Sequence, residues 1–176
     1  MSPFAPRKDV LSRSVRRRST RRNSRNLAKI VYPIPRVGAS NVMNHEQELI
    51  AAFVLPEKRT RYLGFASDPK RRKKLLDGLL HSFVFVPSCV VQIPSSEQDP
   101  NCIAKLLRAS GAGAVCHVIS ELRELDGREM ELREALEHIV GSNMATILSC
   151  LPGRLAYFEA EGLRHRYILQ QGRPAS

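Results

Sequence analysis

Tryptophan is absent from this sequence, and phenylalanine and tyrosine together make up only 6% of the chain. Four cysteines are present, but they lie far apart with no C-x-x-C pair, which argues against a disulfide framework or a zinc ribbon. No apolar run approaches the roughly 20 residues that a membrane helix needs. These absences predict a reduced, cytoplasmic protein without a membrane partner, and no motif indicates a metal or another cofactor.

Acidic residues are scarce at the N-terminus. Residues 1–42 hold 11 lysines and arginines against one acidic residue, a net charge of +10, whereas residues 43–176 carry a net charge of +1. This segment has little apolar surface to bury and its charges repel one another, so ordering it would cost chain entropy without return. We therefore expect residues 1–42 to be a disordered basic tail and the folded domain to start near Met43.

Several interpretations suit such a tail. It is able to bind phosphates by counterion release, and its arginine- and serine-rich composition is also that of an organellar transit peptide. Thr20-Arg21-Arg22 has the form of a twin-arginine export signal, but the apolar stretch that follows is too short and interrupted for export. The abrupt change in composition before Met43 also fits a misassigned start, with the native protein beginning there.

The remaining residues have the length of one domain. Apolar residues at helical spacing predict a helix over 45–55, and a second short helix is expected around Tyr62. Asp68-Pro69 and Asp99-Pro100 each combine a capping residue with proline at the first helical position. These two pairs predict helices that start there and run to about Ser82 and Ser110.

Strand signals follow the helical half. Two β-branched and aromatic runs, 83–86 and 89–93, are divided by proline and predict short strands or extended segments. The apolar run 114–120 predicts a buried strand. Two turn signals separate three later β-rich segments, which predicts an antiparallel meander; the segments are 144–151, 154–160 and 165–169.

A helix is expected between the strand at 114–120 and this meander. Asp126 and Glu129 are spaced like a capping box and predict that the helix opens there. The sequence as a whole therefore predicts an α+β fold over residues 43–170, with a helical N-terminal half and a β-α-β-β-β unit that ends in the meander. Residues 171–176 are expected to be disordered.

One basic stretch lies inside the predicted domain. Residues 58–74 hold eight lysines and arginines against Asp68, a net charge of +7. Basic residues at a helix N-terminus oppose the helix dipole, and that cost indicates a use. We expect the stretch to contact nucleic acid, another phosphate-bearing ligand or an acidic protein, the alternative being a solvated helix face. The candidate contact residues are Lys58, Arg59, Arg61, Lys70, Arg71, Arg72, Lys73 and Lys74.

Polar side chains gather where the predicted strand 114–120 ends. Ligand sites often form at strand ends in α/β units, and paired carboxylates there are able to bind a metal or act as acid and base. The alternative is that these residues cap a helix and solvate a loop. The candidate polar site consists of Ser120, Glu121, Asp126, Arg128 and Glu129.

Three further motifs are better explained by structure than by chemistry. Residues 110–114 have the composition of a phosphate-binding glycine loop, but they follow a helix and open a strand, which favours a helix C-cap. Cys150 needs a neighbouring base such as His117 or His165 to act as a nucleophile, and a free cysteine is more often a small core residue. Zinc ligation by Cys116 and His117 is disfavoured because adjacent residues on a strand point to opposite faces. His45 and His138 are expected on helix surfaces.

The segments Val118–Glu121, Leu125–Met130 and Ile147–Glu159 resemble a small bacterial protein family that has no assigned function. The resemblance covers residues 43–170 and implies a domain start near Met43, but no catalytic residue. Besides a purely structural role, two hypotheses about function follow from the residues alone. The first is a binding or regulatory module that uses the basic stretch, and the second is a small enzyme that uses the polar site.

Overall fold

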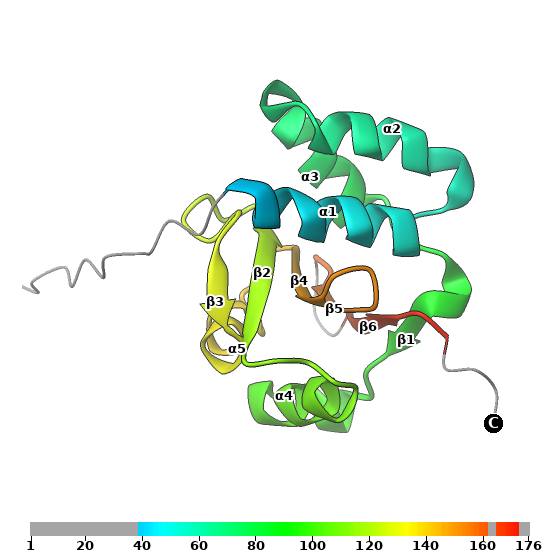
Figure 1. The fold of residues 1–176 in the computed structure, drawn as a ribbon. Coiled ribbons are helices and arrows are strands. Elements are labelled where there is room, and N and C mark those ends of the chain that lie inside the picture. The colour runs from blue at the N-terminus through cyan, green and yellow to red at the C-terminus, as the bar shows by residue number, and fades with distance from the viewer. Residues whose placement is uncertain (1–38, 162–164, 173–176) are drawn as a thin grey trace, which may run out of the picture. The chain divides into compact units, whose positions relative to one another are not determined.

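The computed structural model describes residues 39–161 and 165–172, with side chains described from His45 onward. Within these residues the chain forms five α-helices and a six-stranded sheet (Figure 1). The helices are α1 (Ala39–Phe53), α2 (Pro56–Ala66), α3 (Arg72–His81), α4 (Pro100–Ala109) and α5 (Leu132–Ile139). The strands are β1 (Val90–Gln92), β2 (Val115–Ser120), β3 (Glu129–Glu131), β4 (Thr146–Leu151), β5 (Leu155–Glu159) and β6 (Arg166–Gln170).

The sheet is antiparallel throughout, with the strand order β1-β6-β5-β4-β2-β3. The expected meander is confirmed as β4, β5 and β6, and the strand expected at 114–120 is β2. The run 89–93 supplies β1 at one edge. In the run 83–86, by contrast, only Phe85 makes a bridge, to Val54. The α+β class predicted from the sequence is thus the observed one.

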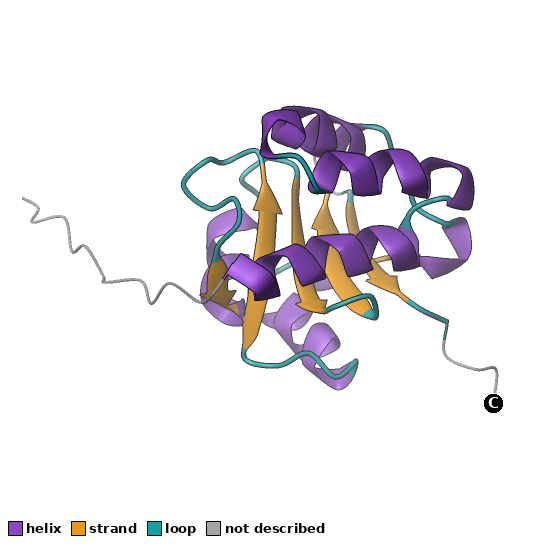
Figure 2. Ribbon diagram, turned by 45° about the horizontal axis from the view of Figure 1, so that its top comes forward, coloured by secondary structure: helices purple, strands orange, loops and turns teal. Residues whose placement is uncertain are grey.

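Helices cover both faces of the sheet (Figure 2). On one face, α1, α2 and α3 pack on inward-facing strand residues such as Ile119 and Phe158. On the other face, α4 and α5 pack on alternate residues such as Val118 and Tyr157. Because both faces are covered, the central strands β4 and β5 are buried along almost their whole length, including the polar residues Thr146, Ser149 and Glu159.

The expected helix caps are largely confirmed. The Asp68 side chain accepts a hydrogen bond from the Lys70 amide, although the first turn it caps is a short 3₁₀ segment, Pro69–Arg71, that leads into α3. The Asp99 side chain accepts from the amides of Asn101 and Cys102 at the start of α4. At the other end of α4, Gly111 has a positive φ of 98°. The Ala112 and Gly111 amides donate to the Leu107 and Arg108 carbonyls, which makes residues 110–114 a helix C-cap.

The capping box expected at Asp126 and Glu129 is wrong. Helix α5 begins six residues after Asp126, and its N-cap is Glu131, whose side chain accepts from the Glu134 amide at 2.9 Å. Glu129 instead belongs to β3, which pairs with β2 before the helix begins. The spacing rule selected the wrong acidic residue because three glutamates or aspartates within six residues offer competing N-cap positions.

Helix α1 begins at Ala39, which is the first residue that the structure describes, so the domain start expected near Met43 stays a prediction. Most of the basic tail expected at 1–42 lies outside the described residues, as do residues 173–176 of the expected C-terminal tail. None of the helices in the described part of the chain is long and apolar enough to cross a membrane.

A buried ion pair stabilises the face covered by α5. The Glu159 carboxylate, almost fully buried, accepts from the Gly141 amide at 2.8 Å, from the Tyr157 hydroxyl at 2.6 Å and from the Arg166 guanidinium at 3.1 Å. Burial next to this carboxylate raises the pKa of Tyr157 far above its ordinary value. Every partner is supplied by the fold, so we regard this cluster as structural.

Candidate functional site

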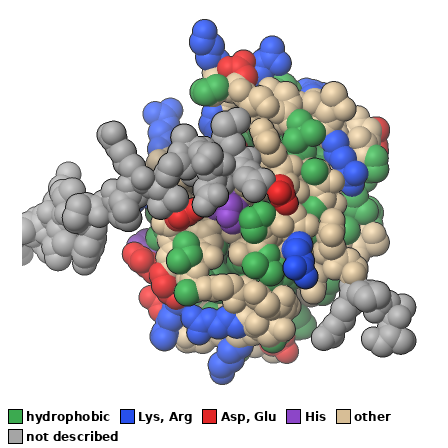
Figure 3. Space-filling view, viewed as in Figure 1, with side chains coloured by type: hydrophobic (Ala, Val, Ile, Leu, Met, Phe, Trp, Pro, Cys, Tyr) green, Lys and Arg blue, Asp and Glu red, His purple; other side chains and the backbone are tan. Residues whose placement is uncertain are grey.

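The eight basic residues singled out in the sequence divide into two groups in the structure. Lys58, Arg61 and Lys74 line one groove. The others point elsewhere or are used by the fold: the Arg59 Nε donates to the Val54 carbonyl at 2.8 Å, and Arg71 pairs with Asp68 at 3.3 Å. In Figure 3, Lys and Arg side chains gather over the α2–α3 end of the molecule and, separately, over the α4 end.

The groove lies between α2 and α3, and we call it the α2–α3 groove. It encloses about 520 Å³, and its remaining lining includes Tyr62, Phe65, Asp77 and Ser82. Three basic side chains thus face one acidic side chain in it. The groove therefore combines positive charge with little free aromatic surface, because Tyr62 is only 6% exposed and the Arg61 guanidinium lies over the Phe65 ring. Such a lining is suited to phosphates.

The residues that start and cap the helices of this region shape the α2–α3 groove. Pro56 starts α2 and Asp68 caps the turn before α3, so the two helices come from one short stretch of chain and pack against each other. Gly78 of α3 lies directly against the Tyr62 ring, where a Cβ atom would come within 2.4 Å of the Tyr62 hydroxyl oxygen. The Arg61 guanidinium lies 5.3 Å from the centre of the Phe65 ring, a cation–π contact that holds its charge on the groove wall.

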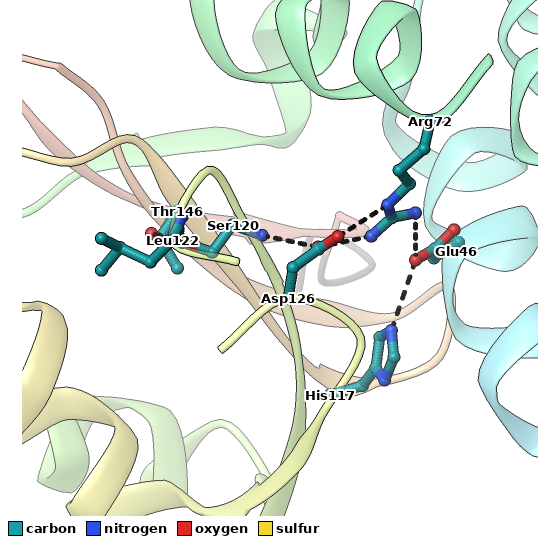
Figure 4. A network of polar contacts seen from close by, with 7 residues as sticks. All are labelled: Glu46, Arg72, His117, Ser120, Leu122, Asp126 and Thr146. Carbon is teal, nitrogen blue, oxygen red and sulfur yellow. Dashed lines mark hydrogen bonds and ion pairs between the residues drawn. The ribbon is translucent and has the colours of Figure 1, made fainter. Parts of the chain in front are cut away.

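Arg72 leaves the basic stretch and enters an ion-pair network that we call the Arg72 network (Figure 4). Its Nη1 donates to Glu46 of α1 at 2.6 Å, while its Nε and Nη2 donate to both carboxylate oxygens of Asp126 at 2.9 and 2.5 Å. Asp126 also accepts from the Ser120 amide at 3.1 Å. The His117 Nε2 lies 3.5 Å from the same Glu46 oxygen that Arg72 binds. The network joins α1, α3 and the loop between β2 and β3.

The charges in the Arg72 network are fixed by one another. Burial alone would raise the pKa of Glu46, but the contacts with His117 and Arg72 outweigh it and lower that pKa below its ordinary value. Burial would likewise lower the pKa of Arg72, yet Asp126 and Glu46 raise it. Each charge is therefore held in its ionised form by a partner, which suits a structural link better than a group that exchanges protons.

The candidate polar site is gathered only in part. Ser120, Glu121 and Asp126 line one cleft of about 320 Å³, together with Arg72, Lys73 and Arg123. Arg128 and Glu129 are not in its lining, and Glu129 pairs with His117 across β2 and β3. The Ser120 hydroxyl lies 2.7 Å from that of Thr146 and accepts from the Leu122 amide. Ser120 and Asp126 thus have partners within the fold.

A third hollow, which we call the Phe83 cleft, has no counterpart in the sequence reasoning. It encloses about 320 Å³ at the C-terminal end of α3 and is lined by Leu80, His81, Phe83, Phe158, Glu161, His165 and Tyr167, among others. Phe83 is 47% exposed and has a positive φ of 40°. A phenylalanine rarely adopts this conformation, and the sequence predicts only a short strand or extended segment at 83–86, so no sequence signal marks the site.

His81 links the Phe83 cleft to the end of β2. Its Nε2 lies 2.6 Å from a Glu121 oxygen and its Nδ1 lies 3.2 Å from a Glu161 oxygen. The hydrogen bond with Glu121 is the main reason that the pKa of His81 is raised above its ordinary value, with Glu161 adding to it. Glu121, expected in the candidate polar site, therefore serves as a partner of His81.

The histidine and cysteine chemistry considered in the sequence is not brought together. His117 pairs with Ser149 across β2 and β4, so Cys150, the next residue, points to the opposite face of the sheet. Burial raises the pKa of the Cys116 thiol to about 12 and that of Cys150 further, which makes both poor nucleophiles. His45, expected on a helix surface, is half-buried, with its Nδ1 3.0 Å from the Ser149 hydroxyl. No metal-binding cluster of His, Cys, Asp or Glu occurs among the residues that the structure describes.

Comparisons with known protein families, curated proteins and solved structures find no match to this chain. The resemblance to a small bacterial family therefore stays a prediction. Function is therefore inferred from the α2–α3 groove, the cleft at Ser120, the Phe83 cleft and the Arg72 network.

Proposed function

We propose that this protein is a small cytoplasmic binding module that contacts nucleic acid through the α2–α3 groove. The observation that carries the proposal is the convergence of Lys58 and Arg61 from α2 with Lys74 from α3 on one groove. Cations fixed on two helices match a ligand that carries several phosphates in a row. Each contact with a phosphate releases a bound counterion, which supplies affinity without sequence specificity.

The distribution of charge over the chain supports this choice of ligand. Residues 1–42 add a net charge of +10 to the basic stretch at 58–74, while the remainder of the chain is close to neutral or acidic. An excess of lysine and arginine in the same chain as a basic groove is typical of proteins that bind a phosphate backbone.

The test is a titration of fluorescently labelled oligonucleotides with the full chain over a range of salt concentrations. Affinity should fall steeply with salt, and the variant K58Q/R61Q/K74Q should lose much of both the affinity and the salt dependence. Three lost phosphate contacts correspond to a decrease of about 2 in the slope of log affinity against log salt for a single strand.

A matched control removes the same charge from the other face of the molecule. Lys105, Arg108 and Arg133 are exposed on α4 and α5, so the variant K105Q/R108Q/R133Q has the same net charge as the groove variant. It should bind nearly as well as the unchanged protein. Equal losses in both variants would mean that net charge and not the groove governs binding, and binding of acidic peptides but no oligonucleotide would identify a protein partner instead.

A small enzyme that works at the cleft of Ser120, Glu121 and Asp126 is a second proposal. It is favoured by the presence of a hydroxyl and two carboxylates in one cleft. It is weaker because the hydroxyl of Ser120 and the carboxylate of Asp126 already have partners in the fold. Turnover of simple ester or phosphoester substrates that is lost in Glu121→Gln would support it, and no turnover in the unchanged protein would count against it.

A further inference from the structure

We infer that the nucleic acid is single-stranded and that one of its bases stacks on Phe83, in the Phe83 cleft beside the α2–α3 groove. This inference rests on the proposed function and specifies its substrate class. It depends on three observations: the exposure and backbone conformation of Phe83, the chemistry of the cleft, and the end of α3 that cleft and groove both reach.

Phe83 is held outward by its neighbours. Its ring makes edge contacts with Tyr167 and Phe85, with centroids 5.4 and 6.1 Å away, and lies 6.4 Å from Phe158. Yet nearly half of its surface is exposed, whereas Phe85 and Phe158 are buried. Packing against these rings therefore holds Phe83 on an unfavourable positive φ without covering it. It is suited to offering a ring face to a ligand.

The chemistry of the Phe83 cleft suits a base and not a phosphate. The carboxylate of Glu161 is 70% exposed and lies beside His81, which already binds Glu121. Negative charge here repels a phosphate but accepts hydrogen bonds from the amino groups of adenine, cytosine or guanine. The rings of Phe83 and Tyr167, with His165 beside them, supply the apolar surface on which a base stacks.

Groove and cleft both reach the C-terminal end of α3. Ser82 lines the α2–α3 groove, while His81 and Phe83, on either side of it in the chain, line the Phe83 cleft. A backbone that follows Lys74 toward Ser82 therefore arrives next to an aromatic platform. In a duplex the bases are stacked inside and unavailable to such a platform. Only a single strand places phosphates in the groove and a base on Phe83 at once.

The test measures the affinity of the full chain, at one fixed low salt concentration, for three fluorescent probes. These are a mixed-sequence single-stranded oligonucleotide, the corresponding duplex, and an abasic single strand of equal length. We expect the intact single strand to bind at least about fivefold more tightly than the abasic one, since each stacked base contributes that much or more. The duplex gains nothing from Phe83, so its affinity should be the same for the unchanged protein and for Phe83→Leu.

Two substitutions locate the effect. Phe83→Leu keeps an apolar side chain but removes the ring, and should lower the affinity for the intact strand by about fivefold or more while leaving abasic binding unchanged. Phe83→Trp keeps a ring and should retain the affinity. Val91→Ala removes another exposed apolar side chain, on β1, and serves as the control. Thermal unfolding of each variant checks that the fold persists.

Two failures are distinguishable. If none of the probes binds in a salt-dependent manner, the proposed function is wrong and this inference falls with it. If the probes bind and the groove variant K58Q/R61Q/K74Q weakens them, but intact, abasic and duplex probes bind alike or Phe83→Leu changes nothing, the groove proposal stands and the base-stacking site is wrong.

Discussion

Arg72 and Lys74 lie two residues apart in one basic stretch, but they have different surroundings. Arg72 is 28% exposed and bridges Glu46 and Asp126, residues 26 and 54 positions away in the chain. Lys74 is exposed and lines the α2–α3 groove with Lys58 and Arg61. A run of like charges is thus not one functional unit, because the turn of a helix sends adjacent residues to different faces. The partner of each cation decides whether it stabilises the fold or is available to a ligand.

The largest expected effect comes from breaking the Arg72 network. Arg72→Met leaves the carboxylate of Glu46, 8% exposed, and that of Asp126 without their cation. Removing one partner from a buried ion pair costs about 3 kcal/mol of unfolding free energy. Urea unfolding measures this loss. The oligonucleotide affinity of the folded variant should change little, and an unchanged urea midpoint would contradict a structural role for Arg72.

The next effect concerns the groove wall. Gly78→Ala places a Cβ atom within 2.4 Å of the Tyr62 hydroxyl oxygen, so the ring has to move and the unfolding free energy should fall by about 1–2 kcal/mol. Gly64→Ala in α2 is the matched control, since its Cβ would meet nothing within 4 Å. That control should be neutral or stabilising by up to about 1 kcal/mol. Equal stability of the two variants would refute the close packing of Tyr62 on α3.

A smaller effect on stability, seen only at acidic pH, distinguishes the Arg72 network from the α2–α3 groove. The pKa of Glu46 in the folded protein is lowered from 4.5, so its contribution to stability is present above about pH 4.5 and is lost as the pH falls through the folded-state pKa. Glu46→Gln should therefore unfold with a weaker pH dependence below pH 4.5 than the unchanged protein. The groove variant K58Q/R61Q/K74Q should keep the full dependence. Chemical unfolding at a series of pH values measures both.

The smallest effect is expected for Arg71, the residue before Arg72. Its ion pair with Asp68 is exposed, with side-chain exposures of 54% and 40%. Such surface pairs contribute little, so Arg71→Gln should change the unfolding free energy by less than about 0.5 kcal/mol. Arg71 is also not part of the groove lining, so affinity should fall only slightly. A loss as large as that of Arg72→Met would show that position within the stretch does not matter.

Features of the fold that depend on neighbouring residues were predictable from the sequence. The caps at Asp68 and Asp99, the glycine that ends α4 and the three-stranded meander all follow from local backbone preferences. Where several candidates competed locally, as among the acidic residues before α5, the rule chose the wrong one. Strand β3 was missed because three residues carry too little periodicity to be recognised.

The sites were less predictable than the fold, because their members are far apart in the chain. The sequence marked Lys58, Arg61 and Lys74, but it could not separate them from Arg72, whose partners lie on α1 and in the loop after β2. Ser120, Glu121 and Asp126 were correctly placed near one another, but their hydrogen-bond partners were not foreseen. The sequence predicts a short strand or extended segment at Phe83 and not its positive φ, since a positive φ outside glycine is imposed by tertiary contacts and leaves no mark in composition.

The two outermost strands, β1 and β3, are each only three residues long. Such short edge strands offer few unpaired backbone donors and acceptors to another chain, which disfavours edge-to-edge aggregation of copies. They equally disfavour recognition by the addition of a peptide as an extra strand. An interaction of this protein is thus expected to depend on side chains and not on main-chain ladders.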